Sequence, residues 1–595
     1  MSERYQAWLL RAVLLLVPFV IFFPTLEAGF LNWDDDVNVF ENPHVQGLTG
    51  ENLKWMFTDF GHAIRYKPLS WLGWAIVHEC FGLNPFGFHL ANVLIHGLNT
   101  LLLFEVMRRL VRLATGNHNE AGGFTNTVCI IGALLWALHP MRVEPVAWIS
   151  GFGYQAAVTW LLAATILYLR SQEDSVPAMT RRTNYWLAVG CYGLATITYP
   201  IVLGFPALLI AIDFFPLRRF TSNDQLALWS DSARRVWLRK LPFILIAAGM
   251  VAFTLYGRYR FTDYWIKPAA MEDFGLGART MQAAYVWAYY AWKPLLPTDL
   301  SPVYTTLIWN QPLDIPFVFS LVIVVGITAL LIFRRRQWPA VLAIWIAHLG
   351  LLVPMLGLTE RPHYTHDRYG IINGALWPLL LVTVLIRFRT RLTVRKWTPL
   401  VGLCLLILCG TMSFRQTRIW QNDIAFFTHM SASLGANQYR NLALMNLGEA
   451  LMTADRNDEA LAAFEAAAKR DVLWISPFDF QRLALSHGSA LLNLGRWREA
   501  ETKFREILQA NPDHIPARNN LAISLWKTDR LNEAITELQS VINRNPDKPD
   551  GHLNLASLLI ESGRPWEASP HLQKARELGA DPRLVDAKET QIGAR

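Results

Sequence analysis

The apolar segments of this chain constrain its fold more than any other feature. Before about residue 415, runs with almost no charge recur, and with their flanks they approach the roughly 20 residues that cross a bilayer. The runs are residues 12–23, 128–138, 158–169, 317–333, 341–356 and 400–409. With 52% hydrophobic and 17% charged residues, the chain is too apolar for an ordinary soluble enzyme. The sequence predicts an all-α, polytopic membrane helix bundle.

Basic residues orient the predicted spans. They cluster in short loops, at 108–112, 181–182, 218–219, 234–240, 334–336 and 387–396, which is typical of cytoplasmic loops. The eleven predicted spans are 9–25, 86–108, 126–140, 146–169, 185–199, 202–217, 241–257, 315–333, 339–356, 370–386 and 398–413. An odd number of spans places the N-terminus inside and the C-terminus outside. The first span is expected to be retained, because its apolar run is long and no small-residue cleavage site follows it.

Two more apolar stretches are predicted to lie in the membrane interface. A full span at 70–82 would move Arg108 and Arg109 to the wrong side, so we expect an interfacial helix there. Residues 281–292 are rich in tyrosine and tryptophan, which is typical of an interfacial aromatic belt.

Charge and cysteine content exclude several classes of function. The net charge of +8 is explained by the inside loops, so no nucleic-acid partner is predicted. The five cysteines fall mostly in apolar segments without metal-ligand spacing, so we expect neither disulfides nor zinc. No cofactor is predicted. A divalent metal is not indicated either, because a single acidic loop without further ligands is weak evidence for a bound cation.

After about residue 420 the pattern changes to a helical repeat. Ala460, Ala500, Ala534 and Ala568 occupy equivalent places, and the last three are spaced by 34 residues. This pattern resembles tetratricopeptide repeats, in which helix pairs stack into a solenoid with a concave groove. The first unit carries six extra residues, expected around 474–478. The predicted domains are a transmembrane domain, 1–420, and a repeat domain, 421–595, that binds proteins.

Three consecutive carboxylates follow the first span. Asp34, Asp35 and Asp36 are flanked by Trp33 and Phe40, and a basic and aromatic segment follows at 65–68. A solvated loop is the ordinary explanation for such a triplet. The combination also suits a general base beside an anionic headgroup substrate: a hydroxyl acceptor needs a carboxylate to take its proton, and a phosphate leaving group needs cations.

Other polar residues gather on the predicted outer face, at 139–145, in the 258–314 loop and at 360–369. Ionisable residues at the membrane boundary are costly and tend to mark a site. The alternative is that Arg142 pairs with Glu144, and Arg361 with Asp367, merely to hold loops together.

In these motifs the chain resembles the membrane-embedded (GT-C type) glycosyltransferases. It is most similar to the transmembrane and tetratricopeptide-containing O-mannosyltransferases and their bacterial relatives. The motifs are residues 34–35, 42–45, 57–61, 66–69, 87–96, 139–140 with Glu144, and 363–370. The resemblance implies inverting transfer of a sugar from a polyprenyl-phosphate carrier to a protein hydroxyl, with the repeats recruiting the acceptor. It also implies an inner-membrane location with a cytoplasmic N-terminus and periplasmic repeats.

The resemblance implies roles for individual residues. Asp34 or Asp35 is the expected base, with Asp34 ranked first and Asp36 a neighbour that raises its pKa. Lys67, Arg361 and Arg368 are expected to bind the donor phosphate. The residues expected to line the site are Asp36, His89, His139, Arg142, Glu144, His363 and Tyr364. For His89 and His139 the alternative is an ordinary structural role.

Two departures from the family pattern leave other functions open. Phe152-Gly153-Tyr154 stands where an Arg-Ala-Asp is expected, and Tyr199-Pro200 where a Lys-Glu is expected. These departures are compatible with a donor that carries a sugar other than mannose, and with a loss of transferase activity. The alternatives are an oligosaccharyl or glycolipid transferase and a non-catalytic membrane scaffold for assembly of envelope proteins.

Overall fold

The chain forms two compact units in the computed structural model, Met1–Phe426 and Phe427–Arg595. The structure describes residues 3–62, 65–116, 123–222, 225–226, 228–260, 268–309, 311–360, 363–435, 438–469 and 477–593. The boundary expected from the sequence, after residue 420, falls just before helix α18 (Asp423–Ser433), which contains the junction.

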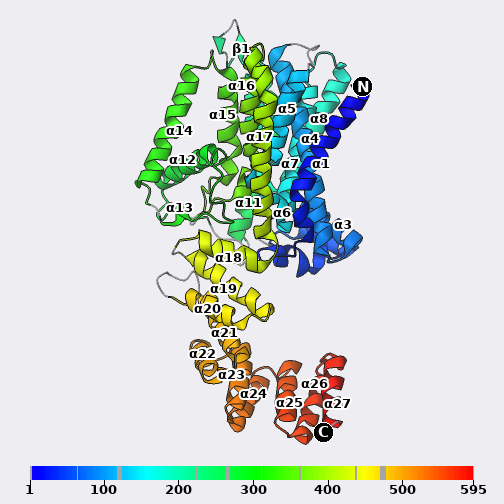
Figure 1. The fold of residues 1–595 in the computed structure, drawn as a ribbon, viewed down its shortest axis with the longest axis vertical. Helices are drawn as coiled ribbons and strands as arrows, with labels where there is room; N and C mark the ends of the chain where they lie inside the picture. The colour runs from blue at the N-terminus through cyan, green and yellow to red at the C-terminus, as the bar shows by residue number, and fades with distance from the viewer. Residues whose placement is uncertain are drawn as a thin grey trace. The chain divides into compact units, whose positions relative to one another are not determined.

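The first unit is a helix bundle (Figure 1). The helices that correspond to predicted spans are α1 (Glu3–Phe22), α4 (Pro85–Thr115), α5 (Gly123–Ala137), α7 (Phe152–Arg170), α8 (Ala178–Thr198), α9 (Phe205–Phe214), α11 (Leu241–Arg260), α14 (Ile315–Phe333), α15 (Pro339–Leu351), α16 (Leu376–Arg387) and α17 (Leu392–Thr417). Each predicted span therefore has a helix.

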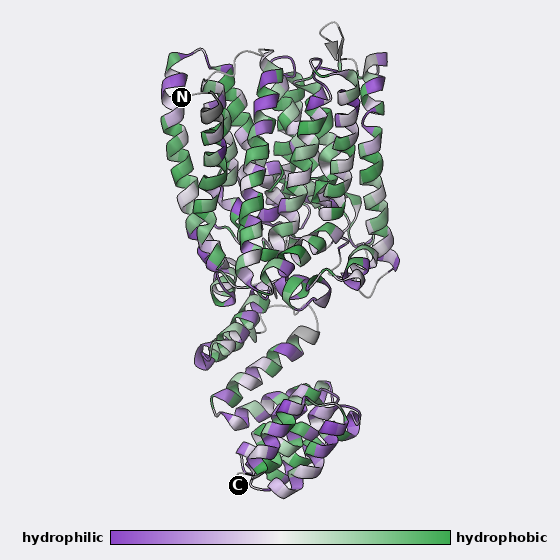
Figure 2. Ribbon diagram, turned by 90° about the vertical axis from the view of Figure 1, so that its right-hand side faces the viewer, coloured by the Kyte–Doolittle hydropathy of each residue, from purple (hydrophilic) through white to green (hydrophobic). Residues whose placement is uncertain are grey.

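Length and composition support membrane crossing for most of these helices. Among the described residues, six helices are long and apolar enough to span a membrane. A seventh is obtained if α5 and the bent segment Pro140–Ala147 count as one span. Three shorter apolar helices, Pro200–Phe214, Pro339–Leu351 and Asn373–Arg387, add to these. Apolar residues dominate the outer helices of the bundle (Figure 2). The chain is a multi-pass membrane protein.

Helix α4 lies at the centre of one half of the bundle, where it contacts α1, α5 and α7. The connecting elements collect at its two ends (Figure 1). At one end lie α2 (Gly50–Thr58), α3 (Pro68–Phe81), α6 (Val143–Ala147) and α13 (Thr306–Trp309). The small hairpin of β1 (Thr221–Ser222) and β2 (Gln225–Leu226) lies at the opposite end, followed by α10 (Asp231–Leu238). The candidate site described below belongs to the α3 end.

Residues 281–292, predicted to lie in the membrane interface, are largely covered by protein. These residues belong to α12 (Leu276–Trp292), which packs against α14 inside the unit. Tyr289 and Tyr290 are buried in a core cluster with Met141 and Leu352. The aromatic side chains that suggested a belt therefore fill a protein core. The predicted helix at 70–82 is present as α3 and buries Trp71 and Trp74.

The second unit contains the predicted solenoid. Its helix pairs are α19 (Gln438–Thr453) with α20 (Asn457–Ala467), α21 (Pro477–Asn493) with α22 (Trp497–Ala510), α23 (Ile515–Lys527) with α24 (Leu531–Arg544), and α25 (Pro549–Glu561) with α26 (Pro565–Glu577), followed by α27 (Pro582–Gly593). Small residues allow close pairing: a Cβ at Gly448 would lie 2.4 Å from the ring of Phe464. Most of the predicted six-residue insertion, near 474–478, lies outside the described residues.

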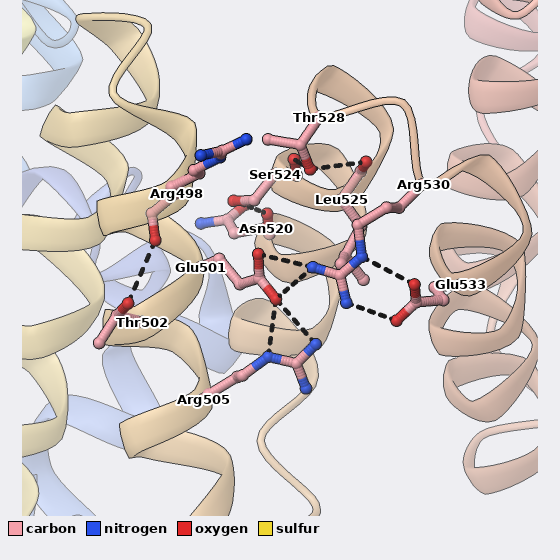
Figure 3. Close-up of polar contacts among 10 residues, drawn as sticks. All are labelled: Arg498, Glu501, Thr502, Arg505, Asn520, Ser524, Leu525, Thr528, Arg530 and Glu533. Carbon is pink, nitrogen blue, oxygen red and sulfur yellow. Dashed lines mark hydrogen bonds and ion pairs between the residues drawn. The ribbon is translucent and has the colours of Figure 1, made fainter.

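Charged side chains link successive repeats on the solenoid surface. Arg530, which precedes α24, binds Glu501 of α22 at 2.9 Å and Glu533 of its own helix at 2.6 Å (Figure 3). Single exposed ion pairs contribute little, but a shared arginine fixes the geometry of neighbouring units. The predicted all-α fold, a membrane bundle followed by helical repeats, is confirmed.

Candidate functional site

The acidic loop has an unusual backbone that exposes one aspartate and buries the next. Asp34 adopts a left-handed conformation with φ of 68°, which aspartate tolerates better than most residues. Residues Asp36–Phe40 then form a π-helical turn, a feature frequent at functional sites. The side chain of Asn42 accepts a hydrogen bond from the His44 backbone at 3.1 Å and caps the next turn. Asp34 is exposed, whereas Asp35 is completely buried.

Asp35 is held by three hydrogen bonds. Its Oδ2 accepts from the Leu31 backbone at 3.1 Å, and its Oδ1 accepts from the backbone and the Oγ of Ser150 at 2.9 and 2.6 Å. Burial raises the pKa of Asp35 to about 7, although the Ser150 and Leu31 hydrogen bonds oppose the shift. Asp35 therefore joins the loop after α1 to the segment before α7.

The Ser150 contact continues to Lys67. Asn38 donates to the Oγ of Ser150 at 3.0 Å, and Lys67 donates to the Oδ1 of Asn38 at 2.7 Å. Lys67 is buried, and its ammonium lies 5.1 Å from the ring centre of Trp74. Burial lowers the pKa of Lys67 to about 7, although the negative charge of Asp34 acts in the opposite direction. Lys67 is thus bound to the same loop that exposes Asp34, and the two charges interact.

A second buried network centres on Arg368. Its guanidinium forms an ion pair with Glu144, and its Nε donates to the hydroxyl of Tyr154 at 3.1 Å. The Tyr154 hydroxyl also hydrogen bonds with that of Tyr199 at 2.8 Å. Tyr154 and Tyr199 are the positions at which the sequence departs from the family pattern. They retain polar contacts in the site.

Trp148 connects the two networks. The Arg368 guanidinium lies 5.0 Å from its ring centre, and its indole N–H donates to the Trp33 carbonyl at 2.8 Å. Trp148 therefore contacts both the Arg368 network and the acidic loop. Phe152, another departure, lies in the core beside Trp74, with ring centres 6.1 Å apart.

Of the two alternative pairs considered from the sequence, Arg142 with Glu144 is not formed; Arg361 with Asp367 stays untested because Arg361 lies outside the described residues. Glu144 pairs with Arg368, while Arg142 donates to the Gly370 carbonyl at 2.8 Å. Asp367 accepts from the Tyr304 hydroxyl at 3.0 Å. Burial, with a contribution from Glu144, raises the pKa of Asp367 to about 8. Sequence proximity favoured Arg142 as the partner, but the fold brings Arg368 to Glu144 from 224 residues away.

A cavity of about 560 Å³ adjoins the Arg368 network. One part has apolar walls from α11 and from the segment before α9. The other part is polar and is lined by Arg65, Arg258, Glu360, His363, Tyr154, Tyr199 and Tyr369. Arg258 pairs with Glu360 and donates to Thr359 Oγ1 at 2.9 Å. Electrostatic interactions join Arg65 to Tyr199, Tyr369 and Glu360. The cavity can accept a molecule with an apolar part and an anionic part.

Both parts of the chain are similar to known proteins. A tetratricopeptide repeat family model matches residues 491–552. The protein O-mannosyl-transferase Tmtc3 of Drosophila melanogaster is 33% identical over 136 residues, which cover 22% of this chain and 14% of that protein. A protein O-mannosyl-transferase of Caenorhabditis elegans is 23% identical over 345 residues, 55% of this chain and 45% of that protein.

The chain resembles the protein O-mannosyl-transferases. The predicted resemblance is confirmed, and the chain spans less than half the length of these relatives. Among solved structures, ArnT from Cupriavidus metallidurans, bound to undecaprenyl phosphate, is similar with a TM-score of 0.35 and 15% identity. That match covers 90% of this chain and 88% of ArnT.

The structure brings most residues expected from the O-mannosyl-transferase resemblance to one end of the bundle. Asp35 and Lys67 are joined through Ser150 and Asn38, and Asp34 and Asp36 belong to the same loop as Asp35; Glu144 and Arg368 form the second network. Arg361 lies outside the described residues. His363 lines the cavity and contacts Glu360 at 3.1 Å; Tyr364 is half-buried.

Two of the expected site histidines have ordinary structural contacts. His89 is within 3.4 Å of the Gly29 carbonyl, and His139 within 2.8 Å of the Pro294 carbonyl. His139 also accepts from the Met141 backbone at 3.3 Å. These contacts favour the structural alternative for both residues.

Sequence reasoning missed several residues of the site. Ser150 and Asn38 are common residue types without a motif, and only the fold places them between Asp35 and Lys67. Arg65 was visible as part of the basic segment before α3. In the described ranges, no group of three or more histidine, cysteine, aspartate or glutamate residues has a metal-binding arrangement.

Proposed function

We propose that this chain is a glycosyltransferase of the membrane, which moves a sugar from a polyprenyl-phosphate carrier to a protein hydroxyl. Mannose is the sugar that the named relatives suggest. The observation that carries the proposal is the exposed Asp34 in the loop whose Asn38 binds Lys67, at the same end of the bundle as a part-apolar cavity lined by arginines. Such a transferase needs a base, cationic groups and an apolar groove for the lipid.

Asp34 is the better candidate for the base. It is exposed and can therefore contact an acceptor hydroxyl. Asp35 cannot readily do so, because it is buried and its oxygens accept bonds from Leu31 and Ser150. We assign Asp35 the role of positioning the loop that presents Asp34. The acceptor hydroxyl, deprotonated by Asp34, would attack the sugar carbon from the side opposite to the departing phosphate. This attack would invert the configuration at that carbon.

Arg65 and Arg258 suit the donor phosphate. Both line the polar part of the cavity, whose other walls include Ile244, Val251 and Leu255 of α11. An isoprenoid chain can lie along those apolar side chains, which places the phosphate at the arginines. Their positive charge then stabilises the charge that the phosphate gains as the glycosidic bond breaks. Arg368 acts indirectly in this proposal, by orienting Tyr154 and Tyr199 toward the same cavity.

The repeats suit recruitment of the acceptor. A solenoid of helix pairs offers an extended surface for a polypeptide, and protein binding is the common use of such repeats. In the proposed orientation the Asp34 loop and the repeats share the outer side of the membrane. For a bacterial protein, this is the periplasmic side of the inner membrane.

The test compares single-residue variants of the full chain in membranes supplied with polyprenyl-phosphate mannose and a serine- and threonine-rich polypeptide. Sugar on the polypeptide is measured by mass spectrometry. Asp34→Asn is expected to lose about 10²- to 10⁴-fold in rate, the usual contribution of a general base. The matched control is Glu41→Gln, which neutralises an exposed carboxylate of the same loop. Unchanged transfer by the folded Asp34→Asn variant would exclude the assignment of the base.

A further inference from the structure

A pocket lies at the opposite end of the first unit from the Asp34 loop. It has a volume of about 390 Å³ and is lined by Leu228, Trp229, Arg234, Trp237, Leu238 and Leu241. These residues come from the segment after β2, from α10 and from the start of α11. The candidate transferase site does not use any of them.

Local hydrogen bonds give this pocket a defined shape. Ser230 caps α10 by accepting from the Ala233 backbone at 3.2 Å. The indole N–H of Trp237 donates to the Leu228 carbonyl at 3.0 Å, which holds the preceding segment against the helix. One face of α10 is buried through Ala233 and Val236, against Phe220.

Large apolar side chains that line this pocket remain exposed, one before α10, one at its end and one at the start of α11. Trp229 is 89% exposed, Leu238 59% and Leu241 47%. Single exposed apolar residues are common, but a contiguous group of this size marks an interaction surface. The surface therefore requires an apolar partner.

The position of the pocket identifies that partner. Leu241 begins α11, a candidate membrane span of which only 17% is buried inside the protein. Much of α11 is therefore not covered by the rest of the protein, and the pocket lies at the first residue of this candidate span. Lys240 holds the junction between α10 and α11 in place. It is buried in an ion pair with Asp213 and donates a hydrogen bond to the Tyr168 hydroxyl at 2.6 Å. Tryptophan is the residue most typical of this depth.

Basic residues determine which lipid suits the pocket. Arg234 lines it, and Arg235 and Arg239 are exposed on the adjacent face of α10. We propose that this pocket binds an anionic phospholipid of the adjacent leaflet. Its acyl chain lies on Trp229, Leu238 and Leu241, and its phosphate contacts Arg234 and Arg235. Apolar and cationic groups occur together in the lining, as recognition of such a lipid requires.

The test measures lipid binding to the purified full-length chain by native mass spectrometry. Phosphatidylglycerol, phosphatidylcholine and inorganic phosphate are titrated separately. Wild type is expected to bind phosphatidylglycerol at least about tenfold more tightly than phosphatidylcholine, and to bind free phosphate much more weakly. R234Q/R235Q should lose about tenfold in phosphatidylglycerol affinity, and W229A should lose affinity for both lipids.

The matched control is R335Q/R336Q, which removes the same charge from the exposed loop between α14 and α15, predicted for the same membrane side. This control should keep the affinity of wild type. Equal losses in R234Q/R235Q and R335Q/R336Q would overturn the proposal, because they would indicate general surface charge. Free phosphate competing as well as the lipid, or W229A binding like wild type, would also overturn it.

Discussion

Asp34 and Asp35 are chemically identical neighbours with different environments. Asp34 has a left-handed backbone and an exposed side chain, whereas Asp35 is buried and accepts hydrogen bonds from the backbone of Leu31 and Ser150. A carboxylate needs access to a hydroxyl to act as a base, while a carboxylate with its oxygens already bonded is suited to holding a loop. In the proposed function, Asp34 therefore acts as the base and Asp35 positions the loop.

Ser150→Ala is expected to destabilise the protein by about 1–3 kcal/mol, because it removes a buried donor to Asp35 and an acceptor for Asn38. The measurement is the thermal unfolding of the purified full chain. Ser320→Ala is the control: Ser320 is buried too, but its hydroxyl bonds only the Pro316 carbonyl of its own helix. A loss no larger in Ser150→Ala than in the control would contradict the role of Ser150.

The raised pKa of Asp35 predicts a pH dependence of stability. Its pKa moves from 3.8 to about 7 on folding, so the folded protein holds the proton more tightly than the unfolded chain. The stabilisation from this group is fully present below pH about 4 and is lost as the pH rises to about 7. As the pH rises from about 4.5 to about 7.5, the melting temperature of the wild type should therefore fall relative to that of Asp35→Asn. A difference that stays constant over this range, or that changes in favour of wild type, would contradict the shift.

Residue patterns predicted the charged members of the site but not their partners. Asp34, Asp35 and Lys67 could be found because charge is conspicuous beside apolar segments. Ser150 and Asn38 could not, since a serine and an asparagine in loops carry no signal until the fold brings them together. Glu144 was assigned to Arg142 by proximity, whereas its ion pair is formed with Arg368.

Helix α12 illustrates the limit of composition at the scale of an element. Its tyrosines and tryptophans are equally suited to a membrane interface and to a protein core. Only the packing against α14 and the burial of Tyr289 and Tyr290 distinguish the two environments. The predicted spans, in contrast, needed only length and apolarity, and each has a helix.

The ion pair of Glu144 with Arg368 joins α6 to the loop at Asp367–Gly370. Arg368→Gln should cost about 3–5 kcal/mol, because it leaves a buried carboxylate without its partner. The double variant E144Q/R368Q should recover part of this loss. Melting temperatures of both variants test the coupling.

Arg456→Gln is the control for this cycle. It breaks an exposed pair with Glu459, which contributes less than about 1 kcal/mol. If E144Q/R368Q melts no higher than Arg368→Gln alone, the buried charge is not the source of the loss.

The whole molecule combines two units whose cores form by different rules. The first unit buries many large aromatic side chains together with polar ones, and the repeats bury a regular set of alanine, leucine and phenylalanine side chains. The first unit is visible in the sequence as recurring apolar runs and the second as a 34-residue repeat. The two regions could therefore be separated without a structure. Each unit has its own core, so each is expected to fold without the other.

Division of the chain tests this independence and the proposed division of labour. Residues 438–593, expressed alone, should be a soluble helical protein with one cooperative unfolding transition measured by circular dichroism. Residues 1–435 should insert into membranes and keep Asp34-dependent transfer to a short threonine peptide. Because the repeats are proposed to recruit the acceptor, transfer to a whole polypeptide should fall more than transfer to the peptide. If removal of the repeats lowers transfer to both acceptors equally, the repeats have a role other than recruitment. If correctly inserted 1–435 loses both reactions, the repeats are part of the catalytic unit.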